Sequence, residues 1–60
     1  MTYIIEILMD DGQKGRLRIR RDSVLLASRK AQDFAGKLAS PGTVYLFTQD
    51  GTCIEHYRHD

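Results

Sequence analysis

The middle of the chain constrains the fold most, because it alone repeats its apolar residues with the period of a helix. Between Asp22 and Ser40 the apolar side chains recur at intervals of three and four, which places them on one helix face: Val24, Ala27, Ala31, Phe34 and Leu38. Asp22 or Ser23 suits the N-terminal cap, with Ser28 as the alternative, and Pro41 stops the helix after Ser40. A single helix cannot bury its own apolar stripe, so the flanking segments must supply a second layer.

Two segments before this helix have the pattern of β-strands. Thr2–Met9 is largely apolar on both alternating faces, which predicts an interior strand. Asp10–Gly15 is a polar loop containing two glycines. Arg16–Arg20 then alternates strictly, with Leu17 and Ile19 on one face and three arginines on the other. The pair predicts a hairpin whose second strand has a cationic face.

Two further strands, Thr43–Gln49 and Thr52–Arg58, are predicted around the hairpin signal Asp50-Gly51. A two-residue turn would pair Phe47 with Ile54 and Leu46 with Glu55. A three-residue turn, Gln49–Gly51, would pair Leu46 with Ile54 and Phe47 with Cys53. We prefer the second register, because it gathers Val44, Leu46 and Ile54 on one face without burying a glutamate, and leaves Tyr45, Phe47 and Cys53 on the other face.

The sequence therefore predicts one α+β domain over residues 1–60, a four-stranded antiparallel sheet with one helix on one face, in ββαββ order. No second helix is available for the other face of the sheet, so arginines and aromatic residues share an uncovered surface.

The short chain favours association into a dimer. A domain of 60 residues buries only about 60% of the surface of its unfolded chain, so it tends to need a supplement to its core. Its single cysteine excludes an intrachain disulfide. We therefore expect a homodimer, and the apolar residues outside the predicted core are its candidate interface: Leu25, Leu26, Tyr45 and Phe47. The start of the helix decides whether the two leucines lie in the core, a loop or an interface.

The overall charge gives little support for nucleic-acid binding. Nine Lys and Arg residues against eight Asp and Glu give a net charge of +1, so no overall field attracts a polyanion. A local patch remains as a candidate for phosphate contact: Arg16, Arg18, Arg20 and Arg21. The alternative is an ordinary solvated strand face.

The sequence gives little support for metal binding or catalysis. Cys53, His56 and His59 are spaced by three, and residues three apart on a strand point to opposite faces, so we assign no metal. Gly12 and Gly15 do not form a phosphate-binding loop, and no nucleophile is placed beside a base, so we expect no cofactor, no catalytic residues and no enzyme. The apolar N-terminal run lacks the features of a signal peptide and is too short for a membrane span, which with one cysteine predicts a cytoplasmic location without membrane contact.

The second half of the chain carries a resemblance. The run AQDFAGKLA from Ala31 to Ala39, followed by VYLF from Val44 and QDGTCIE from Gln49, resembles a family of short, uncharacterised bacterial proteins in which an alanine-rich helix precedes an Asp-Gly hairpin. The likeness covers Ser28–Tyr57, and Tyr3 stands where that family's first strand has tryptophan. It implies a small bacterial or mobile-element accessory protein and transfers no site residues.

Together these features predict a small protein-interaction or regulatory module of unknown specific role that self-associates, with an unknown protein as partner. The alternative is a nucleic-acid-binding module that uses the arginine-lined strand face.

Overall fold

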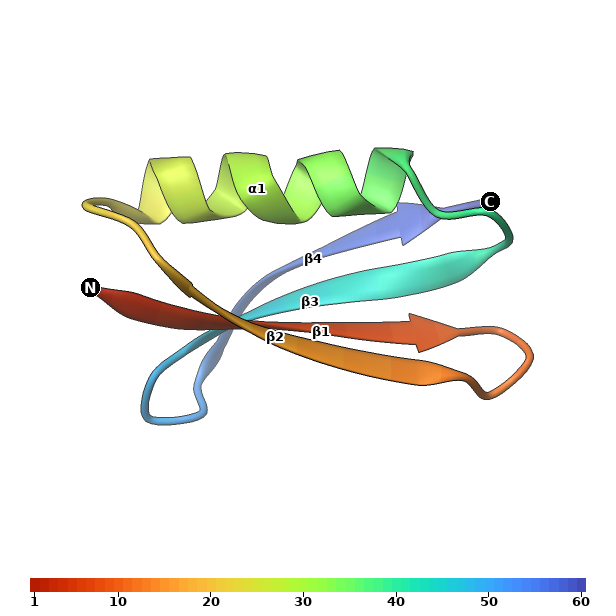
Figure 1. The fold of residues 1–60 in the computed structure, drawn as a ribbon, viewed down its shortest axis with the longest axis horizontal. Coiled ribbons are helices and arrows are strands. Elements are labelled where there is room, and N and C mark those ends of the chain that lie inside the picture. The colour runs from red at the N-terminus through yellow and green to blue at the C-terminus, as the bar shows by residue number, and fades with distance from the viewer.

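The computed structural model describes residues 1–60 and shows four strands and one helix in the predicted ββαββ order (Figure 1). The elements are β1 (Thr2–Met9), β2 (Lys14–Arg20), α1 (Val24–Gly36), β3 (Gly42–Thr48) and β4 (Cys53–His59). All neighbouring strands are antiparallel, in the spatial order β2-β1-β3-β4. The α+β prediction is confirmed, and β1 is an interior strand as its two apolar faces indicated.

The start of α1 agrees with the longer of the two predicted helices. Ser23 is the N-cap, in an extended conformation, and its hydroxyl oxygen accepts a hydrogen bond from the Leu26 N–H at 3.3 Å. The end of the helix was predicted too late: α1 stops at Gly36, not at Ser40. Glycine is a poor helix former, and the next two N–H groups, of Lys37 and Leu38, make shorter-range turns to the carbonyls three residues back.

Alanines, rather than the larger residues of the predicted stripe, form the centre of the helix–sheet contact. Ala27, Ala31 and Ala35 are buried, at a spacing of four residues. Ala35 was not part of the predicted stripe, and Val24, which was, is 49% exposed at the helix start. Small side chains let the helix backbone approach the sheet, where the fully buried side chains are Tyr3, Ile5, Val44 and Leu46.

The β3–β4 hairpin combines parts of both predicted registers. Near the turn Phe47 pairs with Cys53, as the preferred three-residue turn required, and Gly51 has the positive φ of 95° that such a turn needs. The predicted pairing of Leu46 with Ile54 is wrong, because a bulge shifts the register and Leu46 pairs with Glu55. The extra residue lets Ile54 pack on the core while Glu55 stays exposed.

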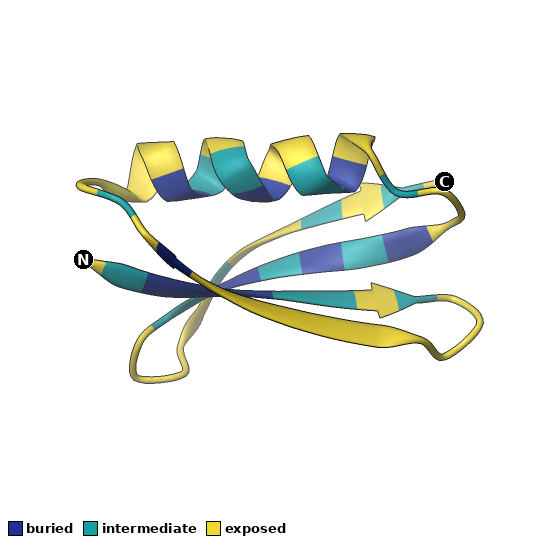
Figure 2. Cartoon of the chain, viewed as in Figure 1, coloured by how far each residue is buried: buried dark blue, intermediate teal, exposed yellow.

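Helix α1 covers only half of the sheet. It packs against β3 and β4, and β2 has one buried residue, Ile19 (Figure 2). Leu17 points to the helix side, because it pairs with the buried Ile5, and yet it is 40% exposed. The helix-side surface of β1 and β2 is therefore partly open.

An ion pair joins β4 to the turn that follows β1. The Arg58 guanidinium on β4 donates to both carboxylate oxygens of Asp10, just after β1, and also to Thr43 and Asp60. The hydrogen bonds from Arg58 are the main reason that the pKa of Asp10 lies below its ordinary 3.8; desolvation opposes them less strongly, and the charge of Arg58 adds a smaller lowering. The contact ties the β1–β2 turn to the C-terminal strand.

This pair predicts an acid-sensitive contribution to stability. A lowered folded-state pKa stabilises the protein above the unfolded pKa and loses that effect as the pH falls through the folded value. Asp10→Asn should therefore unfold at lower urea concentration than the native chain at pH 6, and at nearly the same concentration near pH 2. Asp22→Asn, which neutralises an exposed carboxylate elsewhere, is the control. A difference that persists unchanged at pH 2 would contradict the assignment.

Candidate binding surfaces

The uncovered sheet face carries two parallel rows of side chains separated by β1. One row is cationic and lies on β2: Lys14, Arg16, Arg18 and Arg20. The other is aromatic and lies on β3 and β4: Tyr45, Phe47 and His56. The strand register places Ile4, Glu6 and Leu8 of β1 between them. The sequence prediction that arginines and aromatic residues share this face is confirmed.

The basic row is open to solvent and weakly paired. Arg16, Arg18 and Arg20 are all exposed, and the one ion pair in the row, Arg16 Nε to Glu6 Oε2, is long at 3.9 Å. Arg21, which the sequence grouped with them, lies beyond the end of β2 and donates from Nη1 to the Arg20 carbonyl at 2.7 Å. It is bound to the backbone rather than aligned with the row.

The aromatic row is continuous, with Tyr45 and Phe47 half-buried and His56 exposed. The ring centroids of Tyr45 and Phe47 are 6.3 Å apart, and those of Tyr45 and His56 are 6.2 Å apart. His56 was considered in the sequence only as a metal ligand; its place beside Tyr45 depends on the bulge, which no sequence motif announces.

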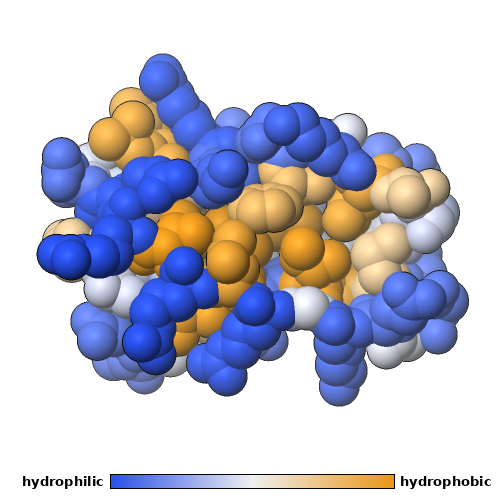
Figure 3. Space-filling view, in the orientation of Figure 1, coloured by the Kyte–Doolittle hydropathy of each residue, from blue (hydrophilic) through white to orange (hydrophobic).

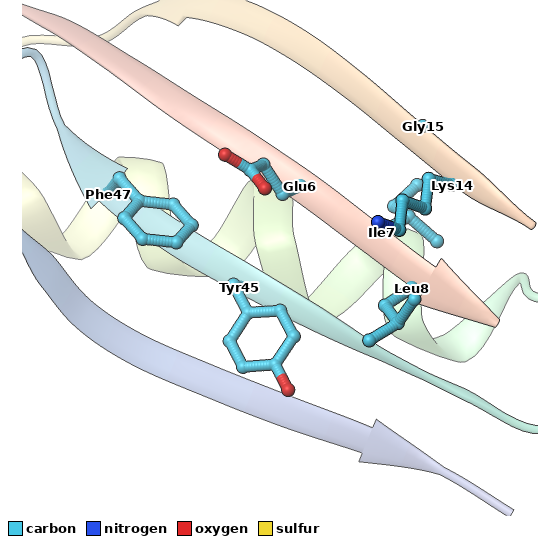
Figure 4. Close-up of a pocket in the computed structure, with 7 residues that line it drawn as sticks. All are labelled: Glu6, Ile7, Leu8, Lys14, Gly15, Tyr45 and Phe47. Atoms are coloured by element: carbon cyan, nitrogen blue, oxygen red, sulfur yellow. The ribbon is translucent and has the colours of Figure 1, made fainter. Parts of the chain in front are cut away.

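A shallow hollow of about 250 Å³ lies beside these rings. Figure 4 shows the Glu6 carboxylate and the side chain of Leu8 on β1 facing the rings of Tyr45 and Phe47 on β3. Lys14 borders it from β2. The hollow brings an acid, two aromatic rings and an amine together on the face away from the helix.

The other side of the same strands carries an apolar shelf, which we define as Ile7, Leu17 and Ile19. Their buried register partners place all three toward the helix: Ile7 lies opposite Val44, Leu17 opposite Ile5, and Ile19 opposite Tyr3. On β2, Ile7 lies opposite Gly15. Gly15 has no side chain to cover the flank of Ile7. In the space-filling view an apolar band crosses the molecule between α1 above and hydrophilic side chains below (Figure 3).

Strand β2 is also an unpaired edge of the sheet, and the hydrogen bonds at its two ends show which backbone groups are free. Met1 and Arg21 exchange two bonds, 2.9 and 3.0 Å long, and Met9 donates to Gln13 at 2.8 Å. Bonded and non-bonded pairs alternate along an antiparallel ladder, so Gly15, Leu17 and Ile19 turn their backbone groups toward β1. The N–H and C=O groups of the basic row point outward: Lys14, Arg16, Arg18 and Arg20. The Arg20 carbonyl is consistent with this assignment, because it accepts a hydrogen bond from the Arg21 side chain and not from β1.

Leu25 and Leu26, which are not part of the predicted apolar stripe, lie on the first turn of α1. Leu25 is 63% exposed and Leu26 is 41% exposed, so both belong to the surface and neither to the core.

Cys53 is an exposed free thiol, and no three His, Cys, Asp or Glu side chains come close enough together to hold a metal. The 13-residue α1 is too short to traverse a bilayer.

A scan against protein-family models and searches of curated proteins and of solved structures found no match to this chain. The resemblance to short bacterial proteins stays a prediction.

Proposed function

We propose that this protein is a small protein-interaction module that binds another polypeptide along β2. The observation that carries the proposal is Leu17, a large apolar side chain 40% exposed on an otherwise regular strand. It lies in a shelf continuous with the buried core, and it is bordered by an unpaired strand edge. Exposed apolar surface of this kind in a soluble domain is typical of an interaction site.

The two edge strands of the sheet, β2 and β4, differ in a way that favours β2 as the strand that pairs with a partner. Strand β4 is bent by its bulge, and bulges are one of the devices that make an edge a poor template for another strand. Strand β2 pairs with β1 over seven consecutive residue pairs with no register shift and contains no proline. An added strand would find a regular edge with free backbone groups there.

Self-association, expected from the chain length, remains part of the proposal, with a constraint on its geometry. If two copies paired through β2, each arginine of one copy would lie opposite a Lys14, Arg16, Arg18 or Arg20 of the other, because these residues alone turn their backbone groups outward. Like charges directly opposite each other destabilise a strand pair. A homodimer would therefore use the shelf, the leucines of α1 or the aromatic row, and not the β2 edge.

A second candidate is single-stranded nucleic acid on the uncovered face. The specific observation in its favour is that Tyr45 and Phe47 can stack on bases while the arginine row lies two strands away, about 10 Å at the usual strand spacing. Glu6 lies between the two rows and would repel phosphates. We rank this candidate below protein binding for that reason and because the net charge is only +1.

Selection from a displayed library of random peptides tests the proposal without assuming the partner. Peptides enriched on the native chain should lose binding to Leu17→Glu and to Leu17→Thr, which keeps the strand propensity. They should keep binding to Leu25→Glu, an equally apolar residue changed on α1. Circular dichroism confirms that each variant is folded.

Failure to enrich any peptide, or equal loss with the Leu25 variant, would overturn the proposal. If no peptide is enriched but labelled single-stranded DNA or RNA binds at low salt and Phe47→Ala abolishes that binding, the nucleic-acid candidate replaces it.

A further inference from the structure

We infer that the partner recognised along β2 is an extended segment in which acidic and apolar residues alternate. This inference rests on the proposed function and names the chemistry of its partner. It follows from the fact that the two faces of the β2 edge carry opposite kinds of side chain, basic on one and apolar on the other.

The backbone fixes which partner residues meet which side chains. A strand added to β2 forms its hydrogen-bonded pairs with the residues whose N–H and C=O point outward, and these belong to the basic row. In such antiparallel pairs the two side chains lie on the same face of the sheet, with Cα atoms about 5.5 Å apart. Every partner residue opposite Arg16 or Arg18 therefore projects over the uncovered face beside a guanidinium. Carboxylates there would form charge-assisted pairs.

The intervening partner residues project to the helix side. There they lie beside Gly15, Leu17 and Ile19, the residues of β2 that point toward α1. An apolar side chain beside Leu17 would cover its exposed surface, and one beside Gly15 would occupy the space that the glycine leaves over Ile7. The alternation of β2 itself thus selects the alternation of its partner.

The charge on the edge gives selectivity. Arginines along an exposed edge prevent pairing with a second copy of β2 and with basic or neutral strands, which is the protective role that charged edge residues commonly have. Only a partner that supplies negative charge at every second position converts this repulsion into attraction. Of these arginines, Arg18 and Arg20 have no ion pair within the chain, and Arg16 has only the long contact with Glu6.

Arg21 sets one limit of the site. Because its guanidinium donates to the Arg20 carbonyl, that end of the edge is already bonded, and the centre of the docking strand falls at Arg16 and Arg18. A docked strand that extended past Arg18 would have to displace this contact.

Synthetic peptides test the inference. A five-residue peptide with glutamate at odd and valine at even positions matches Lys14–Arg18, the part of β2 that ends before the Arg21 contact. It should bind the native chain, and binding should weaken as salt rises because the pairs are partly exposed. A peptide of the same composition with its glutamates in one block and its valines in another should bind at least about tenfold more weakly, since it cannot place charge and apolar surface on opposite faces.

Reversing the charge of Arg18 tests whether β2 selects acidic over basic peptides. Arg18→Glu should weaken the glutamate–valine peptide about tenfold and strengthen the corresponding lysine–valine peptide, because one attractive cross-strand pair becomes repulsive. Arg29→Glu, the same charge change on the exposed surface of α1, should alter neither affinity by more than about twofold.

Equal binding of the alternating and blocked peptides, or equal effects of the two charge reversals, would overturn the inference. So would peptides enriched by library selection that depend on Leu17 but lack acidic alternation. That last outcome leaves the proposed function standing and removes only the partner chemistry, whereas failure to enrich any Leu17-dependent peptide removes both.

Discussion

Leu46→Ala is expected to remove a large part of the free energy of unfolding of the domain. Leu46 is fully buried at the centre of β3 and belongs to the same core cluster as Ile5 and Ala31. Truncating a buried leucine to alanine costs about 2–5 kcal/mol, through lost burial and the cavity left behind. A chain of 60 residues has a total stability of roughly 3–9 kcal/mol at the usual values per residue. The loss is therefore a large fraction of the total stability of the domain, and the midpoint of urea unfolding should fall accordingly.

Urea unfolding followed by far-ultraviolet circular dichroism measures this effect. Leu25→Ala is the matched control, because it makes the same chemical change at a side chain that is 63% exposed, and it should change the stability by less than about 0.5 kcal/mol. If both variants were equally stable, Leu46 would not lie in the core and the assignment of sheet faces would be wrong.

Ala31→Leu is expected to destabilise the domain by about 1–3 kcal/mol, although leucine is nearly as good a helix former as alanine. Ala31 is fully buried between α1 and the sheet, where the alanine spacing lets the helix pack closely. A leucine there has to push the helix away from β3 or adopt a strained rotamer. The loss of stability therefore reports the closeness of the helix–sheet contact.

The neighbouring position supplies the control for this second variant. Gln32 is exposed on α1, so Gln32→Leu should leave the urea midpoint nearly unchanged. A tolerated Ala31→Leu would mean that the helix meets the sheet through the larger residues of the originally predicted stripe, such as Phe34 and Leu38, with space left at the alanines.

Local patterns in the sequence were enough to predict the elements and their order. Strict alternation in Arg16–Arg20, the Asp-Gly turn and the three-four spacing from Val24 each depend on near neighbours in the chain. The errors arose where longer-range packing decides. The bulge beside Leu46 reconciles a three-residue turn with an exposed Glu55. The helix ends at Gly36, an exposed residue of low helix propensity, before the predicted stripe is complete.

The candidate surfaces were predictable only in part. Alternation alone placed the arginines on one face and Leu17 on the other. The strand order and the lateral position of α1 determine that β2 is an edge and that Leu17 is left exposed, and neither can be derived from composition or spacing. The assignment of free backbone groups to the arginines requires the hydrogen bonds at Met1 and Met9.

Amide hydrogen exchange along β2, measured by nuclear magnetic resonance, tests whether the backbone groups of Arg16 and Arg18 are free to pair with a partner strand. In the free protein the amides of Arg16 and Arg18 should exchange fast, whereas those of Leu17 and Ile19, bonded to β1, should exchange slowly. Addition of the glutamate–valine peptide should slow exchange at Arg16 and Arg18 and leave the amides of β4 unchanged. Fast exchange at Leu17 in the free protein, or protection by the peptide at β4 instead of β2, would contradict the account.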